Sequence, residues 1–408
     1  MVNSSYFKNT EIAKEFGISS VSVGRYIEQA SFGHNKLQII KVRGKPRIRR
    51  NDQNYKIIKD LTSDETRFKN KGLLKILRVS DQIYDILNKK QILEIISNLQ
   101  NSKYLPIKYA YFTANKNIWP NFSNESDNSL DQRNSLKRSL NMKLEYISSL
   151  CDQNNCKLNI VQLGTSYRNI SNDFIDNLID NDYVNSIILV DMNDQALKSD
   201  IDLVNERFDP TKVKAIHYDF ERSYCKNFIY EELNALPESE SKILNLFMAV
   251  GANLSNYPSY SKIVECMSDV STDGDLLIYD LVMYHKDIKY IHNFSEGTDR
   301  NEFLTSLPKM LGFKKEDLEL HSEYNPENQI RSVYFSLKEN TNIIIDNLYL
   351  NKPITIKFSK GDRINVMNTK ITDFIYDVNM LRRKSYTLLQ STLSINEKFI
   401  TLLARKSK

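Results

Sequence analysis

Three positions in the middle of the chain carry residue types suited to binding a nucleoside. Gly164 follows a short apolar run, and a glycine there lets the backbone come close to a ligand. Asp191 ends the next apolar run, where a carboxylate can accept hydrogen bonds from both hydroxyls of a ribose. Asp219 and Phe220 follow a third run and offer an adenine a hydrogen-bond acceptor and an apolar wall. Gly164 and Asp191 also have structural interpretations, as a turn residue and as the cap of a helix that begins at Asn193-Asp194.

A parallel sheet would bring these residues together. From Lys157 onward, short apolar runs alternate with stretches of helical periodicity. The runs are Leu158–Leu163, Ser186–Asp191, Val213–Tyr218, Ile243–Val250 and Asp275–Asp280, with helices expected near Ser171–Ile179 and over Asp194–Arg207. This alternation predicts an α/β fold, a doubly wound and mostly parallel sheet with helices on both faces. Ligands of such sheets bind outside the carboxyl ends of the strands, where Gly164, Asp191 and Asp219 are expected.

Before this region the patterns are less regular. Apolar spacing predicts a helix over Lys69–Leu99. The segment Asn121–Asn141 is rich in Asn, Ser and Asp, which predicts a loop before a helix that reaches Leu150.

Several short segments resemble a known family. The fourth run ends in Gly251-Ala-Asn253-Leu254, Pro106-Ile-Lys108-Tyr109 stands upstream, and Gly361-Asp-Arg-Ile364 stands near the C-terminus. In this order they resemble the S-adenosylmethionine (SAM)-dependent histidine Nα-methyltransferases of ergothioneine biosynthesis, over roughly Leu105 to the C-terminus. Asp219-Phe220, Tyr324-Asn-Pro326 and Phe399–Arg405 fit the same family. The resemblance implies a class I SAM methyltransferase fold, which is Rossmann-like, with SAM as cofactor.

The resemblance also implies roles for individual residues. Asn253 would face the amino and carboxylate end of the methyl acceptor, and His292 is the histidine nearest to an acceptor site; we take both as candidate catalytic residues. Asn253 has an alternative role, as the cap of a helix near Pro258–Asp269. Methyl transfer needs alignment more than acid–base chemistry, because the sulfonium already makes the methyl group reactive. The cofactor-binding residues would be Gly164 and Ser166 against the methionine part of SAM, Asp191 on the ribose, Asp219 and Phe220 on the adenine, and Gly251.

The part of the chain that would choose the acceptor departs from the family. Aligned without gaps, Met367 and Thr369 stand where the family has a Glu and a Ser that grip imidazole, and a Met cannot accept a hydrogen bond as a carboxylate does. Trp119-Pro-Asn-Phe122 replaces a pair of tyrosines and an acidic residue, and Tyr290 is the nearest match to a further tyrosine. We therefore predict a SAM-dependent methyltransferase that N-methylates an amino acid or related small amine, but not free histidine with efficiency.

The N-terminal residues 1–72 carry a different pattern. Thr10–Ser19 and Val21–Glu28 resemble the two helices of a bacterial helix-turn-helix, and Lys36–Arg50 predicts a basic hairpin around Gly44-Lys45-Pro46, together a winged helix-turn-helix. Lys and Arg exceed Asp and Glu there by 15 − 7 = +8, against 5 − 8 = −3 for the rest of the chain. This charge favours a nucleic-acid partner, and a protein-docking module is the alternative. The residues expected to contact DNA are Ser20, Ser22, Arg25, Arg43, Lys45 and Arg47.

The remaining observations set the domain plan and the compartment. We expect a helix-turn-helix over 1–72 and a methyltransferase domain over 73–408, with a sheet core at about 157–283 and an α+β acceptor lobe at about 284–395, including strands between Ile330 and Phe358. Apolar runs fall short of the ~20 residues that span a bilayer, and no signal core is visible at the start, so we expect a cytoplasmic protein without membrane attachment. Cys151 and Cys156 stand five apart, but small apolar packing is favoured over a metal site, for which no ligand set is expected.

Two other functions stay open. A nucleic-acid methyltransferase would use the N-terminal module for delivery, although Gly251–Leu254 stands where base aminomethylases carry an Asn-Pro-Pro-aromatic motif. Alternatively, the chain is a DNA-binding regulator whose methyltransferase-like domain only senses SAM or another metabolite.

Overall fold

The computed structural model describes residues 9–15, 38–42, 45–48, 53–54, 74–114, 127–164, 168–219, 225–236, 239–251, 254–257, 260–284, 299–346 and 353–407. The chain divides into two compact units. The first comprises Met1–Leu77 and Leu337–Gly361, and the second comprises Arg78–Ser336 and Asp362–Lys408.

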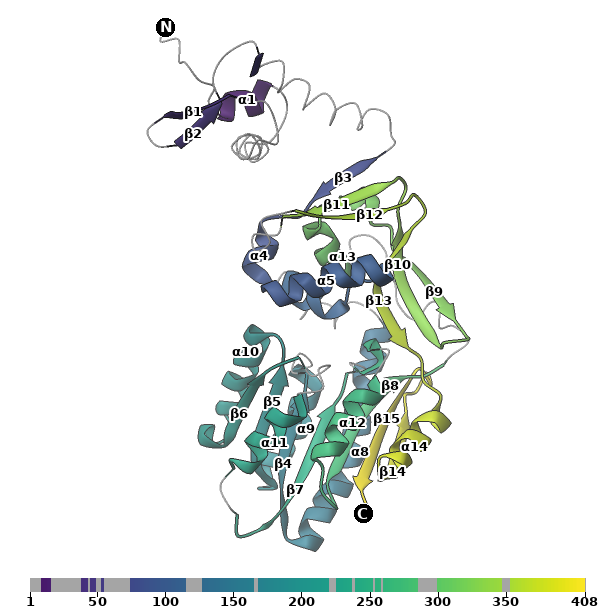
Figure 1. The fold of residues 1–408 in the computed structure, drawn as a ribbon. Helices are drawn as coiled ribbons and strands as arrows, with labels where there is room; N and C mark the ends of the chain where they lie inside the picture. Colours follow the sequence, from purple (N-terminus) through teal and green to yellow (C-terminus); the bar gives the residue numbers. More distant parts are fainter. Residues whose placement is uncertain are drawn as a thin grey trace. The chain divides into compact units, whose positions relative to one another are not determined.

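A seven-stranded sheet forms the centre of the second unit, with the order β14-β15-β8-β7-β4-β5-β6 (Figure 1). Strands β4 to β8 run parallel, whereas β15 is antiparallel to both β8 and β14. Every residue of β5 and β8 is buried, which is typical of central parallel strands covered on both faces. The strands are β4 (Cys156–Leu163), β5 (Val184–Asp191), β6 (Val213–His217), β7 (Lys242–Ala249), β8 (Leu276–Val282), β14 (Tyr386–Leu393) and β15 (Phe399–Lys406).

Helices cover both faces of this sheet, so the predicted doubly wound α/β fold is confirmed. On one face α8 (Asp127–Asn154), α9 (Arg168–Asp180) and α10 (Asp194–Asn205) contribute to one apolar core. On the other face α11 (Cys225–Asn234), α12 (Tyr260–Val270) and α14 (Phe374–Arg383) contribute to a second. The short helices η2 (Pro210–Lys212) and η3 (Leu254–Asn256) precede β6 and α12. All four cysteines are free and buried, and they lie in these two cores, as small apolar residues would.

Two sequence predictions about this unit are wrong. The segment Asn121–Asn141 is not a loop throughout, because α8 begins at Asp127 and buries Leu136, Leu140 and Ile147 at helical spacing. Residues 386–393, expected in the acceptor lobe at about 284–395, form β14 of the main sheet, because β15 offers them an antiparallel partner.

A buried polar chain crosses the sheet near the amino-terminal side of its strands. Asp275, directly before β8, accepts hydrogen bonds from the Asn245 backbone N–H (2.8 Å) and side-chain Nδ2 (2.9 Å) on β7. Asn245 Oδ1 accepts from Asn159 Nδ2 on β4 (3.1 Å). Asn159 Oδ1 in turn accepts from Asn185 Nδ2 (2.9 Å) and Ser186 Oγ (2.7 Å) on β5. Because each amide has its partner only in this alignment, the chain specifies the register of four neighbouring strands.

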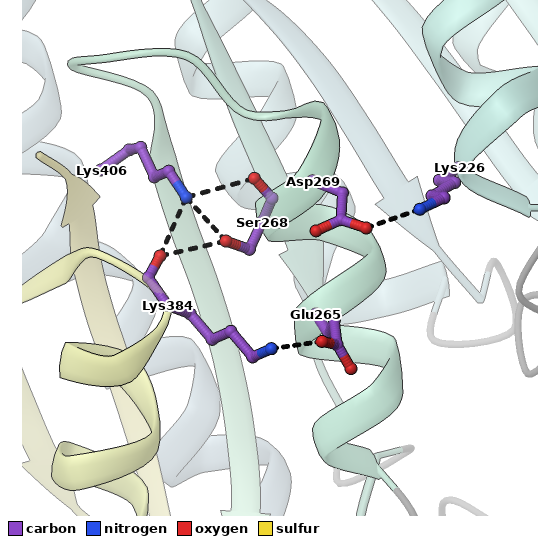
Figure 2. Close-up of polar contacts among 6 residues, drawn as sticks. All are labelled: Lys226, Glu265, Ser268, Asp269, Lys384 and Lys406. Atoms are coloured by element: carbon purple, nitrogen blue, oxygen red, sulfur yellow. Dashed lines mark hydrogen bonds and ion pairs between the residues drawn. The ribbon is translucent and has the colours of Figure 1, made fainter. Parts of the chain in front are cut away.

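The ends of α12 and α14 are joined by Lys406 at the end of β15 (Figure 2). Its ammonium donates to the Ser268 carbonyl (3.2 Å), to Ser268 Oγ (2.6 Å) and to the Lys384 carbonyl (2.8 Å). A cation placed there satisfies carbonyls that the last turn of a helix leaves unpaired. Ion pairs of Lys384 with Glu265 and of Lys226 with Asp269 (2.6 Å) surround this contact and link α12 to both neighbours.

A lobe of the second unit lies around a three-stranded antiparallel sheet, with the order β13-β10-β9. Its strands are β9 (His321–Asn325), β10 (Ile330–Ser336) and β13 (Arg363–Lys370), and α13 (Asp299–Met310) contacts β13. The same unit contains α4 (Gln82–Ile86), α5 (Lys89–Ser102), η1 (Ile107–Tyr109), α6 (Ala110–Thr113) and η5 (Lys315–Asp317). The α+β character predicted for the lobe is therefore present in 299–336 and 363–370.

The first unit contains α1 (Asn9–Glu15), a hairpin of β1 (Ile39–Val42) with β2 (Lys45–Ile48), and a sheet with the order β12-β11-β3. The hairpin predicted around Gly44 is confirmed, with Ile39 opposite Ile48. The expected second helix, Val21–Glu28, lies outside the described residues, so the winged helix-turn-helix stays a prediction.

The sheet of β12, β11 and β3 differs from two expectations about chain organisation. Lys75–Arg78 forms β3 rather than part of a helix over Lys69–Leu99, because Lys75 N–H pairs with the Asn340 carbonyl (2.7 Å). Strands β11 (Thr341–Ile345) and β12 (Ile354–Phe358), expected in the acceptor lobe, belong to the first unit with β3. No helix in the described part of either unit is long and apolar enough to cross a membrane.

Candidate functional site

The carboxyl ends of β4, β5, β6 and β7 carry the residues that the sequence predicts to bind a cofactor. Gly164, Asp191, Asp219 and Gly251 each follow or end one of these parallel strands, so the structure places all four at the same edge of the sheet. Backbone hydrogen bonds join neighbouring ends, from Gly164 N–H to the Val190 carbonyl (2.9 Å) and from Tyr218 N–H to the Asp191 carbonyl (3.0 Å).

Gly164 has a backbone conformation that a side chain would disfavour. Its φ is +79°, in the left-handed region, and the residue is buried. A glycine adopts this φ at little cost, and it places no side chain between the backbone at the end of β4 and a ligand. The turn interpretation and the ligand interpretation of Gly164 are therefore compatible.

Asp191 is the last residue of β5 and is only 8% exposed. Its Oδ1 accepts a hydrogen bond from Asn193 N–H (2.7 Å). Asn193 is the residue that caps α10, because its own Oδ1 accepts from Gln195 N–H and Ala196 N–H. The alternative in which Asp191 caps this helix is wrong, and the carboxylate is held in a fixed position at the sheet edge instead.

Lys108 pairs with two carboxylates at this edge. Its ammonium lies 2.8 Å from Asp219 Oδ2 and 2.8 Å from Glu94 Oε1, with the lysine side chain only 6% exposed. Burial raises the pKa of the adjacent Tyr109 far above its usual value, and its hydrogen bond with Glu94 acts in the same direction. Tyr109 is therefore a neutral hydrogen-bonding group beside the pair that Lys108 forms with Asp219.

The segment that carries Lys108 runs from the lobe to the sheet edge. Leu105 N–H donates to the Asn365 carbonyl of β13 (2.8 Å). Further along, the Tyr111 carbonyl accepts from Asn193 Nδ2 (3.1 Å), next to Asp191. The segment 105–111 therefore contacts β13 of the lobe, and at the sheet edge it contacts Asp219 and Asn193. This position is suited to enclosing a ligand.

The end of β7 is described only in part. Gly251 has a φ of +95°, and η3 begins at Leu254. Helix α12 begins at Tyr260, and the capping role considered for Asn253 stays a prediction. Asn253 itself lies outside the described residues.

Several other predicted residues are likewise beyond what the structure describes. For Lys45 and Arg47 only the backbone of β2 is described. In the described part of the chain no group of three or more His, Cys, Asp or Glu side chains could hold a metal ion. The predicted residues outside the description are Ser20, Ser22, Arg25, Arg43, Ser166, Phe220 and His292.

Two functional candidates were not predicted from the sequence. Lys108 belongs to the segment Pro106–Tyr109 that carries the family resemblance, but its partner Asp219 lies 111 residues away in the sequence. Arg331 on β10 is buried, and no local signal distinguishes it from an exposed arginine in an amphipathic strand.

The sheet has the class I methyltransferase fold, since β15 runs in reverse between β8 and β14 at the end of a parallel β6-β5-β4-β7-β8 set.

No protein-family model matches the chain, and no curated protein does. Solved structures with a similar chain course include the CurJ carbon methyltransferase (7% identity, 99% of this chain and 82% of that chain, TM-score 0.40). Another is magnesium protoporphyrin IX methyltransferase from Synechocystis PCC 6803 with bound SAH (8%, 78% and 100%, TM-score 0.37). A third is 1,6-didemethyltoxoflavin-N1-methyltransferase from Burkholderia thailandensis with bound S-adenosylhomocysteine (7%, 74% and 91%, TM-score 0.36). Because the sequence identities and TM-scores are low, the evidence for the fold is the strand order of the sheet.

Proposed function

We propose that the chain is a SAM-dependent methyltransferase that N-methylates an amino acid or related small amine. The observation that carries this proposal is the position of Asp191, a buried carboxylate at the end of the second parallel strand that does not cap the following helix. In sheets of this kind a carboxylate there binds ribose hydroxyls. Gly164, with its φ of +79°, has no side chain that would keep a ligand from the backbone beside the neighbouring strand.

The residues present fit SAM. Asp191 would hold the ribose, Asp219 the adenine, and Gly164 and Gly251 would lie along the ligand, with Ser166 and Phe220 beside them. When bound, SAM supplies an electrophilic methyl group on a sulfonium. The residues of the chain would then mainly position the acceptor amine, with Asn253 and His292 as candidates for that contact.

The first prediction tests the cofactor site. Asp191→Ala should weaken the binding of S-adenosylhomocysteine at least tenfold, about 1.4 kcal/mol, because charged hydrogen bonds to the ribose are lost. Isothermal titration of the wild-type and variant chains measures this. Asp202→Ala, an exposed carboxylate on α10, is the matched control and should bind as the wild type does. A folded wild-type protein that does not bind S-adenosylhomocysteine would contradict the proposal.

The same titration, repeated with L-histidine in the presence of S-adenosylhomocysteine, addresses the acceptor. We expect weak or no binding, because Met367 and Thr369 replace groups that grip imidazole in the family that the chain resembles. Tight histidine binding would restore histidine as the acceptor.

For residues 1–72 we propose DNA binding, either as part of a regulator that senses SAM or for delivery to a nucleic acid. The antiparallel β1–β2 hairpin supports this, since Lys45 and Arg47 belong to its second strand and to a segment of net charge +8 (15 − 7). Changing both to Glu should lower the affinity for duplex DNA and reduce the slope of log affinity against log salt by about 2. Fluorescence anisotropy over a salt series measures both quantities. Lys357→Glu, exposed on β12, is the control, and an unchanged salt slope in the double variant would exclude the hairpin as the contact.

A further inference from the structure

Arg331 is a buried cation whose charge no described residue balances. The residue is 1% exposed, and it lies on the same face of β10 as Val333 and Phe335, both fully buried. Among the described residues its hydrogen bonding is limited to a long contact from Nη2 to Thr369 Oγ1, 3.4 Å, while Nε and Nη1 have no partner. Buried donors left unpaired cost free energy, and charged ones cost the most.

The surroundings of Arg331 add to this cost. Burial, together with the like charge of Arg300 on α13, lowers the pKa of Arg331 to about 9. An apolar side chain of similar size would be less costly at this position. Positions where a sequence departs from what folding favours are commonly functional, and an unsatisfied buried group calls for a partner.

Arg331 also lies in the part of the lobe that meets the carboxyl edge of the main sheet. Its hydrogen-bond partner Thr369 is on β13, and β13 contacts η3, which follows the end of β7. Directly after β13, Thr372 N–H donates to the Val282 carbonyl at the end of β8 (2.9 Å). The same lobe therefore carries the buried cation and adjoins the strand ends where the cofactor residues lie.

A tyrosine pair extends the same face of the lobe. Across the sheet Arg331 is opposite Tyr324 on β9, and residues opposite each other in an antiparallel sheet are close neighbours. The Tyr324 ring lies 5.7 Å from the ring of Tyr284, just after β8. Two tyrosines therefore connect the strand position opposite Arg331 to the residues just after β8.

We propose that Arg331 and Thr369 bind an anionic group, a carboxylate or a phosphate, of the methyl acceptor. A guanidinium presents N–H donors in a planar fork that matches two oxygens of such a group, and the Thr369 hydroxyl adds a third donor. The anion would supply a partner to unpaired N–H groups of the guanidinium and balance the charge of Arg331. This inference rests on the proposed methyltransferase function and narrows the acceptor to amines that carry an anionic group.

Thermal unfolding of the full chain in different anions tests the proposal. Sodium glutarate and sodium phosphate are each compared with sodium chloride at equal ionic strength, so that screening is constant. We expect glutarate or phosphate to raise the wild-type Tm by about 2 °C or more above its value in chloride. Glutarate acting alone would identify a carboxylate, and phosphate acting alone would identify a phosphate.

Variants assign the shift to Arg331. In Arg331→Met the anion-dependent shift should disappear, while the Tm in chloride should rise because an unbalanced buried charge is removed. Arg363→Met, which removes an exposed arginine on β13 that pairs with Glu323, should keep the full shift. If Arg331→Met does not fold, Thr369→Val serves instead and should at least halve the shift.

The outcomes separate this inference from the proposed function. Equal shifts in the wild type and in Arg331→Met, or no wild-type shift in either anion, would overturn the anion site. S-Adenosylhomocysteine is added to the same wild-type protein in a parallel series. A Tm that rises with S-adenosylhomocysteine but not with the anions removes only the inference about Arg331, and the reverse result removes the methyltransferase function and keeps the anion site.

Discussion

Replacing Asp275 by alanine is expected to lower the free energy of unfolding by about 3 to 4 kcal/mol. Asp275 is fully buried, and its two oxygens accept four hydrogen bonds, from Asn245 N–H and Nδ2 and from Thr272 N–H (2.7 Å) and Oγ1 (3.1 Å). The variant leaves both donors of the half-buried Asn245 without this acceptor, and an unsatisfied buried donor costs about 1–3 kcal/mol. The loss should also loosen Asn159 and Asn185, because the polar chain continues through Asn245.

Urea unfolding followed by circular dichroism measures this effect. Asp273→Ala is the matched control, since Asp273 is an exposed carboxylate of the same turn, and we expect a change within about 0.5 kcal/mol. An Asp275→Ala protein as stable as the control would mean that the polar chain adds nothing to stability.

Replacing Lys143 by methionine is expected to stabilise the chain by up to about 3 kcal/mol at pH 7. Lys143 on α8 is fully buried, and among the described residues its ammonium donates only to Thr392 Oγ1 (3.1 Å), with no carboxylate. Burial lowers the pKa of Lys143 to about 8 from its usual 10.5, and about 2.5 pKa units correspond to about 3 kcal/mol. Methionine has a similar length without the charge, so it fills the same space.

Lys143 should also make the free energy of unfolding depend on pH. Between about pH 8 and pH 10.5 the unfolded chain holds a proton on Lys143 that the folded chain has released. Stability therefore rises with pH over this window, and the penalty is fully present below about pH 8. In Lys143→Met the rise due to this group should vanish. Urea unfolding at pH 7 and pH 10 compares the variant with Lys137→Met, which removes a half-exposed lysine of the same helix. A Lys143→Met protein that is less stable than the wild type at pH 7 would contradict the expected cost of the buried ammonium.

The strand ends at the candidate site could be predicted because their signal is local. Strands such as β5 are buried on both faces, so an unbroken apolar run followed by Asp191 marks both the strand and its carboxyl end. The same reasoning located Gly164, Asp219 and Gly251 at one edge, since parallel strands share their direction.

The remaining features depend on partners distant in the sequence. Whether Lys75–Arg78 forms a strand depends on Asn340, and whether Tyr386–Leu393 joins the main sheet depends on β15. Lys108 and Arg331 are charged side chains that a local pattern assigns to the surface, and only tertiary packing buries them. The polar composition at the start of α8 predicts a loop. The helical spacing of its buried leucines can be recognised only when the helix is known to begin at Asp127.

The position of β15 has a consequence for synthesis on the ribosome. Strand β8 ends at Val282 and β15 begins at Phe399, so 399 − 282 = 117 residues must be added before β8 receives its second neighbour. At typical elongation rates this takes roughly 6 to 23 seconds. During that interval the nascent chain carries an apolar strand with an unpaired edge, which is the kind of surface that pairs with other chains. Nascent chains of this protein that stall within the interval are therefore expected to be good chaperone substrates and prone to aggregate.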